Sequence, residues 1–285
     1  MPKTYNDLYL ETRRVLREKN IAGSDLEARI LVGHAAEKST EALLRDMRLY
    51  AADETVEKLD EMLLRRLEGE PVAYITGSWE FYGLPMEVDE SVLIPRVDTE
   101  VLVETAIDTL TGWKMDARIL DLCCGSGCIG CAIAKEMPAT RVVMADISRD
   151  ALRVSKRNVL INDLTPRVSC IEVDALKAPP MFMGSFDLIV SNPPYIPAGD
   201  IPGLDASVRD YEPVTALDGG ADGLDFYRAI TAKWKEVLRP GGVMMFEVGI
   251  RQAQDVAALM REAGFRGVET AYDTCGIERV VYGHI

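Results

Sequence analysis

Apolar runs alternate with helical segments over the second half of the chain, and this alternation constrains the fold most strongly. The apolar runs predict strands at Arg118–Leu122, Arg141–Ala145, Val168–Val173, Phe186–Val190 and Val243–Val248. Helical patterns fall between them, near residues 127–137, 149–161, 225–238 and 252–263, after a first helix near 98–110. Such alternation predicts an α/β, Rossmann-like domain with a mainly parallel sheet, and residues 267–273 and 278–282 predict a closing antiparallel hairpin.

The first 70 residues show a helical pattern instead. Apolar residues such as Leu26, Ile30, Leu31 and His34 recur at spacings of three and four. The first three are expected in the core of a small bundle, while Ser24 and Glu27 predict a capping box. An aromatic run at Trp79–Tyr82 and an alternating run at Met86–Asp89, on either side of a turn at Gly83-Leu84-Pro85, predict a β-hairpin. We therefore expect a helical domain at residues 1–70, a β-hairpin linker at 71–95 and the α/β domain at 96–285.

The charge balance is acidic throughout, with a formal net charge of −14. Partners recognised through phosphate neutralisation require basic surface, so direct DNA binding is not expected. The first residues lack the apolar region of a signal peptide, and no stretch approaches the roughly 18 apolar residues of a membrane helix. We expect a cytoplasmic protein without membrane contact.

A glycine-rich turn follows the first strand of the α/β domain. Gly125, Gly127 and Gly130 match G-x-G-x-x-G, and Asp146 ends the next strand. Glycines let the backbone approach a ligand closely, and a carboxylate in the position of Asp146 accepts hydrogen bonds from ribose hydroxyls. The turn predicts an adenosine-containing cofactor at the carboxyl ends of the strands.

Two cofactors, a dinucleotide and S-adenosylmethionine, fit such a turn. A dinucleotide places its pyrophosphate on the helix start, whereas the sulfonium compound has no phosphate and tolerates acidic walls. Asp121, at the end of the first strand and near that helix start, favours S-adenosylmethionine. Asp174 and Ala175 follow the third strand and are expected to approach the adenine.

Cys124, Cys128 and Cys131 have the spacing of radical enzymes that hold an iron–sulfur cluster. The glycine turn occupies this interval, however, and the last two cysteines fall inside the following helix. We expect buried cysteines that pack between helix and sheet, and no metal. The carboxylates of Asp205, Asp210 and Glu212 also lack compact ligand spacing.

Asn192-Pro193-Pro194-Tyr195 follows the buried strand at residues 186–190. Proline fixes φ and donates no backbone hydrogen bond, so the turn is rigid. The Asn192 oxygen and a backbone carbonyl can both accept from one NH2 group, while the tyrosine ring covers its planar face. These residues predict a receptor for an amide or amino nitrogen that is alkylated; a proline-rich turn without function is the alternative.

Together these motifs resemble the HemK/PrmC family, protein-(glutamine-N5) methyltransferases that modify peptide chain release factors. The resemblance covers nearly the whole chain and includes Arg65–Ile75, Glu80–Gly83, Val92–Arg96, the glycine turn, Asn192–Tyr195, Glu212–Pro213, Gly219–Leu224 and Pro240–Gly242. It implies a Rossmann-like S-adenosylmethionine-dependent methyltransferase catalytic domain, joined by a β-hairpin to an N-terminal helical-bundle domain for release-factor recognition. The implied reaction methylates the glutamine of a Gly-Gly-Gln motif and leaves S-adenosylhomocysteine.

The resemblance also implies roles for particular residues. The cofactor-binding set is Cys123, Cys124, Gly125, Ser126, Gly127, Asp146, Asp174, Ala175 and Asn192. The substrate glutamine is received by Asn192, Pro193, Pro194 and Tyr195, and the catalytic residues are Asn192, Pro193 and Tyr195. Two positions depart from the family pattern, because Cys123 replaces a usual glycine and Ala175 stands where an aromatic residue is frequent.

Two other functions share parts of this pattern. A DNA N6-adenine methyltransferase would carry the glycine turn and Asn192–Tyr195 together with a basic recognition surface. A non-catalytic module that binds a release factor or the ribosome would tolerate the loss of Asn192. The long segment Gly199–Gly223 lacks periodicity and is expected to border the substrate entrance.

Overall fold

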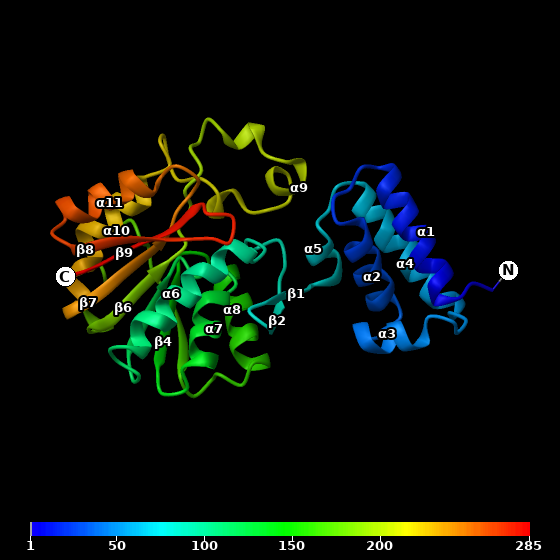
Figure 1. Cartoon of the computed structure of the whole chain (residues 1–285), viewed down its shortest axis with the longest axis horizontal. Helices are drawn as coiled ribbons and strands as arrows, with labels where there is room; N and C mark the ends of the chain where they lie inside the picture. Colours follow the sequence, from blue (N-terminus) through cyan, green and yellow to red (C-terminus); the bar gives the residue numbers. More distant parts are fainter. Residues whose placement is uncertain (1) are drawn as a thin grey trace. The chain divides into compact units, whose positions relative to one another are not determined.

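The computed structural model describes residues 2–285, which form two compact units (Figure 1). The first unit ends at Gly77 and the second is Ser78–Ile285. Within residues 2–285, no helix combines the length and the apolar character that crossing a bilayer requires.

The first unit is a helical bundle, as the sequence predicts. Its helices are α1 (Tyr5–Glu18), α2 (Ser24–Ala35), α3 (Thr40–Asp46), α4 (Asp53–Leu67) and α5 (Val72–Thr76). A capping box begins α1, because the Thr4 side chain accepts from the Asp7 backbone N–H while the Asp7 carboxylate accepts from the Thr4 backbone N–H. Leu8, Leu16 and Leu31 are buried in the bundle core.

The capping box predicted at Ser24 is wrong. Gly23 caps α2 in a left-handed conformation and makes no side-chain cap, and Ser24 is a buried helical residue. The Glu27 carboxylate instead accepts a hydrogen bond from Arg66 Nε at 2.6 Å. A carboxylate paired with a guanidinium in the bundle is not available to the helix start.

Leu26 is not a core residue either, since its side chain is 57% exposed. The buried face of α2 contains Ala28, Leu31, Val32 and Ala35, which share one side of the helix at spacings of three and four. Leu26 lies two residues before Ala28 and therefore points away from that face. Ile30 is half-buried.

The predicted hairpin is confirmed by the strands β1 (Ser78–Phe81) and β2 (Leu84–Glu87), which pair antiparallel. Phe81 and Met86 are buried in the core of the second unit. The Glu87 backbone N–H donates to Asn158 Oδ1 at 2.7 Å, and the Trp79 indole donates to the Pro95 carbonyl at 3.1 Å. These bonds fix the segment that leads through the short helix η1 (Val97–Thr99) into α6 (Glu100–Thr111).

Within the described residues, the second unit contains a seven-stranded sheet of order β5-β4-β3-β6-β7-β9-β8. The strands from β3 to β7 run parallel to one another, while β9 is antiparallel to both β7 and β8. Their bounds are β3 Arg118–Leu122, β4 Arg141–Asp146, β5 Val168–Glu172, β6 Phe186–Ser191, β7 Leu238–Glu247, β8 Arg266–Tyr272 and β9 Glu278–His284. The predicted α/β class and the closing hairpin are confirmed.

Helices cover both faces of this sheet (Figure 1). The helices α6, α7 (Cys128–Glu136) and α8 (Arg149–Ile161) pack on one face, and α10 (Asp225–Lys233) and α11 (Ala253–Glu262) on the other. Neighbouring residues of β3 enter opposite cores, Ile119 the first and Leu120 the second, because successive side chains of a strand point to opposite faces. The helix predicted to reach Leu238 ends at Lys233 and continues as the 3-10 turn η5 (Trp234–Val237).

Short elements complete the connections. The turn η2 (Met181–Met183) precedes β6. The long segment after β6 contains η3 (Ile201–Gly203), α9 (Ala206–Arg209) and η4 (Val214–Ala216). The parallel strands all end toward the same edge of the sheet, so the loops that follow them meet there.

Candidate active site

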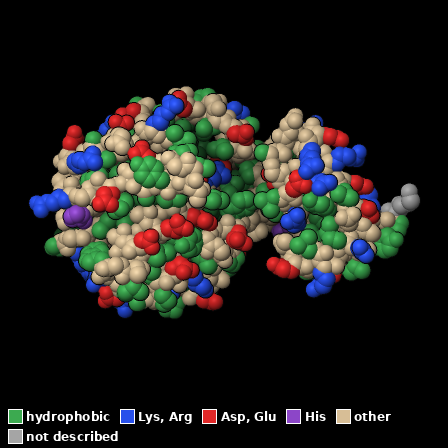
Figure 2. All heavy atoms as spheres, in the orientation of Figure 1, with side chains coloured by type: hydrophobic (Ala, Val, Ile, Leu, Met, Phe, Trp, Pro, Cys, Tyr) green, Lys and Arg blue, Asp and Glu red, His purple; other side chains and the backbone are tan. Residues whose placement is uncertain are grey.

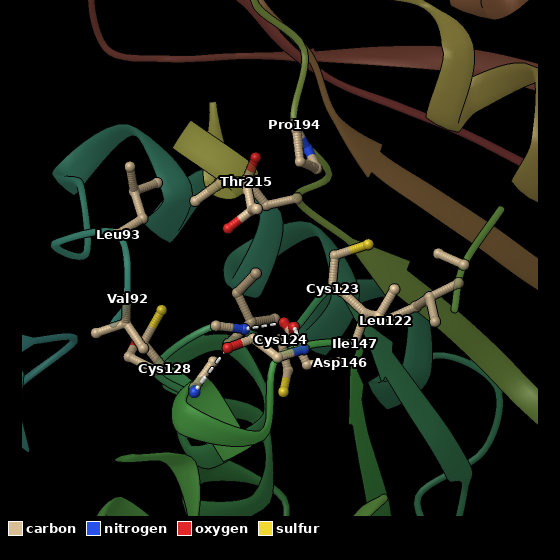
Figure 3. Close-up of a pocket in the computed structure, with 18 of the residues that line it drawn as sticks. Val92, Leu93, Leu122, Cys123, Cys124, Cys128, Asp146, Ile147, Pro194 and Thr215 are labelled. Atoms are coloured by element: carbon tan, nitrogen blue, oxygen red, sulfur yellow. Dashed lines mark hydrogen bonds between the residues drawn. The ribbon is translucent and has the colours of Figure 1, made fainter. Parts of the chain in front are cut away.

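A cavity of about 190 Å³ lies where the parallel strands end (Figure 3). Its walls come from the turn after β3, the residues that follow β4, β5 and β6, and the segment between the hairpin and α6. Figure 3 shows Leu122 and Cys123 on one side and Val92 and Leu93 on the other, with Pro194 between them. The cavity therefore occupies the switch point at which an α/β sheet binds its ligand.

The turn after β3 is built from left-handed residues. Cys123, Gly125 and Gly127 have φ values of 61°, 52° and 79°, and Gly127 caps α7. A Cβ on Gly127 would lie 2.8 Å from Met144 Sδ of β4, so glycine is needed for this close approach. Cys123 occupies a conformation that costs a residue with a Cβ more than it costs glycine.

Asp146, at the end of β4, lies on the cavity wall. Its Oδ2 accepts from the Gly125 N–H at 2.9 Å and its Oδ1 from the Ser148 N–H at 2.9 Å. Burial raises the pKa of this carboxyl, while the backbone donors act in the opposite direction. The carboxylate thus connects the glycine turn to the start of α8 at the cavity wall.

Asp121, in β3, does not line the cavity but connects this strand to α7. It is fully buried, and its Oδ2 accepts from the Gly130 N–H in the first turn of α7 at 2.9 Å. Its Oδ1 has no hydrogen-bond partner within residues 2–285. Burial raises the pKa of Asp121 to about 7, although the bond from Gly130 lowers it.

The clustered cysteines are buried between helix and sheet, as predicted. Cys124, Cys128 and Cys131 are all less than 10% exposed and belong to the core on the α7 face. Burial raises the pKa of Cys128 to about 12, so its thiol stays protonated near neutral pH. No group of three or more His, Cys, Asp or Glu side chains among the described residues is arranged to hold a metal ion.

The turn Asn192–Tyr195 begins where β6 ends. The Ser191 hydroxyl donates to the Leu122 carbonyl at 2.6 Å, which fixes the end of β6 against β3. Asn192 is half-buried, and its Nδ2 donates to Thr99 Oγ1 at 3.4 Å. The Tyr195 backbone carbonyl accepts a hydrogen bond from Gln252 Nε2 at 2.9 Å. Burial raises the pKa of the Tyr195 phenol to about 12.

The cavity brings together most of the predicted site residues. Those that line it are Cys123, Cys124, Gly125, Ser126, Asp146, Asp174, Ala175, Asn192 and Pro194. Among the described residues, Gly127, Pro193 and Tyr195 do not contribute to the lining. Gly127 belongs to the turn after β3 and packs against Met144 and Ser155, outside the lining. Pro193 and Tyr195 belong to the turn after β6, whose first residue, Asn192, lines the cavity.

Several lining residues carried no predicted role. Arg96 and Thr99 come from the segment before α6, Thr215 and Ala216 from η4, and Phe226 from α10. The guanidinium of Arg96 pairs with the carboxylate of Glu212, whose side chain is 1% exposed. Two sequence signals pointed to these residues: the motif Val92–Arg96, and the segment Gly199–Gly223, which was expected to border the substrate entrance and contributes Thr215 and Ala216 to the lining.

Known proteins resemble this chain over nearly its whole length. The sequence profile of the PrmC N-terminal domain matches residues 7–77, and that of the Methyltransferase small domain matches residues 96–201. The Release factor glutamine methyltransferase of Clostridium acetobutylicum is 39% identical over 277 residues, covering 96% of both chains. That of Geobacter sulfurreducens is 42% identical over 274 residues, covering 96% of this chain and 94% of the relative.

A solved structure shares the fold at lower sequence identity. The hMettl16 catalytic domain has a TM-score of 0.57 and 17% identity, with 81% of each chain covered. This likeness supports the methyltransferase fold, and the sequence relatives define the family. The chain belongs to the release factor glutamine methyltransferase family, as its motifs indicated.

Proposed function

We propose that this protein transfers the methyl group of S-adenosylmethionine to the side-chain amide nitrogen, N5, of the glutamine in the Gly-Gly-Gln motif of peptide chain release factors. Family membership supports the reaction and the substrate. The observation that carries the proposal is the position of Asn192, which lines the same cavity as the glycine turn and Asp146. A methyl donor and an amide acceptor would meet in that space.

The residues of the cavity fit S-adenosylmethionine, which supplies an activated methyl group when bound. The Asp146 carboxylate would accept hydrogen bonds from the ribose, and the backbone of Gly125 and Ser126 allows close approach. Ile147, Ala175 and Phe226 provide apolar walls for an adenine. We assign to Phe226 the aromatic surface that Ala175 lacks.

Asn192 and Pro193 would activate the glutamine by orientation. An amide nitrogen is a poor nucleophile, because its lone pair is delocalised into the carbonyl. Two acceptors, the Asn192 Oδ1 and the Pro193 carbonyl, would hold both N–H groups and turn the lone pair toward the methyl donor. Tyr195 would cover the amide plane. This arrangement needs no charged base and no metal.

We assign release-factor recognition to the helical unit, which extends beyond residue 70 through α5 to Gly77, the link to the hairpin segment that follows up to residue 95, and catalysis to residues 96–285. The match to the PrmC N-terminal domain supports the first assignment. Exposed apolar side chains on this unit are available for a protein partner: Leu10, Leu26, Leu44, Leu49, Tyr50 and Leu64.

Charge disfavours the DNA alternative. The net charge is −14, and Glu104 and Asp108 of α6 are exposed. Figure 2 shows further acidic side chains on the same face of the larger unit. Such a surface repels phosphates and accepts basic protein segments.

The proposal is tested by incubating the protein with methyl-tritiated S-adenosylmethionine and either an unmethylated release factor or unmethylated DNA. We expect label in the release factor and none in the DNA. Label in DNA alone would establish the DNA N6-adenine methyltransferase instead. Cofactor binding without any transfer of label would establish the non-catalytic module.

A further inference from the structure

A buried carboxylate lies beside Asn192 at the end of the neighbouring strand. In the parallel pairing of β6 with β7, Ser191 is opposite Phe246, and Asn192 and Glu247 are the residues that directly follow this pair. Glu247 is 2% exposed. Its Oε2 has no hydrogen-bond partner within the described part of the chain. Neither the family motifs nor the mechanism above uses this residue.

The surroundings of Glu247 leave its charge poorly compensated. The charge of Arg279 of β9 lowers the pKa of Glu247, but its guanidinium pairs with Asp98 at 2.6 Å and with Asp273 at 3.0 Å. The other titratable groups that face Glu247 are Tyr195, Tyr227 of α10 and Cys128 of α7. One cation therefore serves several carboxylates, and Glu247 depends on neutral donors.

Those donors are the side chains of Thr99 and Asn192, whose hydrogen-bonding contributions lower the pKa of Glu247. Asn192 Nδ2 also donates to Thr99 Oγ1. A hydroxyl that accepts this bond still has its own proton to donate, and hydrogen bonding from Thr99 lowers the pKa of Glu247. The direction of donation thus runs from the Asn192 amide through Thr99 to the carboxylate.

This direction fixes the Asn192 carboxamide. An ionised carboxylate only accepts hydrogen bonds, so it attracts the NH2 end of an amide and repels the oxygen end. With its Nδ2 held on the protein side, Asn192 must present its Oδ1 to the cavity. A flipped amide would offer a donor to a substrate NH2 group that also donates, and the substrate would not be oriented.

We propose that Glu247 is a positioning residue that fixes, through Thr99, the Asn192 carboxamide with its oxygen toward the substrate nitrogen. This inference rests on the proposed function, because it concerns the acceptor of the glutamine N–H.

Titration of Glu247 makes the arrangement sensitive to pH. Burial raises the pKa of Glu247 to about 7, because its effect is larger than the opposite effect of hydrogen bonding from Thr99 and Asn192. A protonated carboxyl can donate to Thr99 and no longer excludes the flipped amide. Turnover should therefore rise with pH through about 7, with Asp98, Arg279, Asp273, Tyr195, Tyr227 and Cys128 as the surrounding charged or titratable groups.

The kinetic test compares Glu247→Leu, Glu247→Gln and Thr99→Val in the wild-type and Asn192→Ala backgrounds. In the wild-type background we expect Glu247→Leu and Thr99→Val to lower kcat about tenfold, with S-adenosylhomocysteine affinity kept within about twofold. Glu247→Gln retains a neutral acceptor, so its kcat should lie between that of the wild type and that of Glu247→Leu. Its kcat should not rise as the pH passes through 7. In the Asn192→Ala background the same changes should have almost no effect, because Glu247 acts through Asn192. Equal losses in both backgrounds, or an unchanged kcat in Glu247→Leu, would overturn the inference.

A second readout does not depend on methyl transfer. In 15N-labelled protein with S-adenosylhomocysteine, the Asn192 side-chain NH2 resonances are identified by their loss in Asn192→Ala. We expect these resonances to shift with pH around 7 in the wild type and to remain constant in Glu247→Gln. A pH-independent signal in the wild type would refute the positioning role even if release factor is methylated. The expected shift in a protein that does not methylate release factor would refute the proposed function alone.

Discussion

Gly125 and Gly127 lie two residues apart in one turn, yet an added methyl group meets different surroundings at each. Both have positive φ, but a Cβ on Gly125 finds nothing within 4 Å, whereas a Cβ on Gly127 meets Met144 and Ser155. The two positions separate backbone strain from steric exclusion. Cys123 shows that the turn tolerates one non-glycine residue at φ 61°.

We predict that Gly125→Ala lowers the free energy of unfolding by about 1 kcal/mol, through left-handed strain alone. Gly127→Ala should lower it by about 3 kcal/mol or more, since the buried Met144 must also move. Thermal and urea unfolding of both variants measure the difference. Equal losses of stability would contradict the assignment of Gly127 to close packing against β4.

Individual site residues could be predicted where a local sequence pattern defines the backbone geometry. The glycine spacing and the strand end at Asp146 predicted residues that the structure brings to one cavity. Glu247 carried no such signal, because its position beside Asn192 depends on the pairing of β7 with β6. The strand β6 ends at Ser191, more than fifty residues earlier in the sequence. Leu26 was misassigned because its helix buries the face of Ala28 and Leu31 instead.

At the scale of elements, the segment after β6 folds back on the turn that begins with Asn192. The Ile196 N–H donates to the Leu217 carbonyl at 3.0 Å, and the Gly219 N–H donates to the Ile196 carbonyl at 2.9 Å. A Cβ on Gly223 would lie 2.2 Å from the Tyr195 carbonyl oxygen. The glycines near the end of the segment therefore allow two stretches of backbone to touch.

We predict that Gly223→Ala displaces the Tyr195 backbone and reduces methyl transfer at least about tenfold, because active sites tolerate little misplacement. Gly199→Ala is the matched control on the same segment, since a Cβ there meets nothing within 4 Å. Its thermal midpoint should equal that of the wild type. Full activity in Gly223→Ala would show that this contact does not hold the turn.

Most elements were predictable because their hydrophobic periodicity is strong; β3 and α8 have the predicted bounds. The strand β7 begins at Leu238, before its predicted start, because Pro240-Gly241-Gly242 lies within an irregular pairing and not in a turn. The Gly242 carbonyl accepts from the Ile285 N–H at the end of the chain. Sequence patterns do not report such long-range pairing.

At the scale of the whole molecule, buried carboxylates link stability to pH. Burial raises the pKa of Asp121 to about 7 from an ordinary value of 3.8. The folded state thus binds a proton more tightly than the unfolded state does. The stabilisation from that proton is complete below pH 4 and is lost as pH rises to about 7.

We predict that Asp121→Asn, which keeps an acceptor for the Gly130 N–H, gains about 3 kcal/mol relative to the wild type between pH 5 and pH 8. Urea unfolding at both pH values measures this change. Asp60→Asn, at an exposed position, is the control and should follow the wild type. Parallel pH curves for wild type and Asp121→Asn would contradict the burial of an uncompensated carboxylate.

The central claim is that the Asn192 turn receives the glutamine of a release factor beside a bound methyl donor. Its most direct test is tandem mass spectrometry of a release factor incubated with S-adenosylmethionine and either wild-type protein or Asn192→Ala. We predict one added methyl group on the side chain of the Gly-Gly-Gln glutamine with the wild type, and almost none with Asn192→Ala, although that variant still binds S-adenosylhomocysteine. Methylation at another residue, or full methylation by Asn192→Ala, would contradict the account.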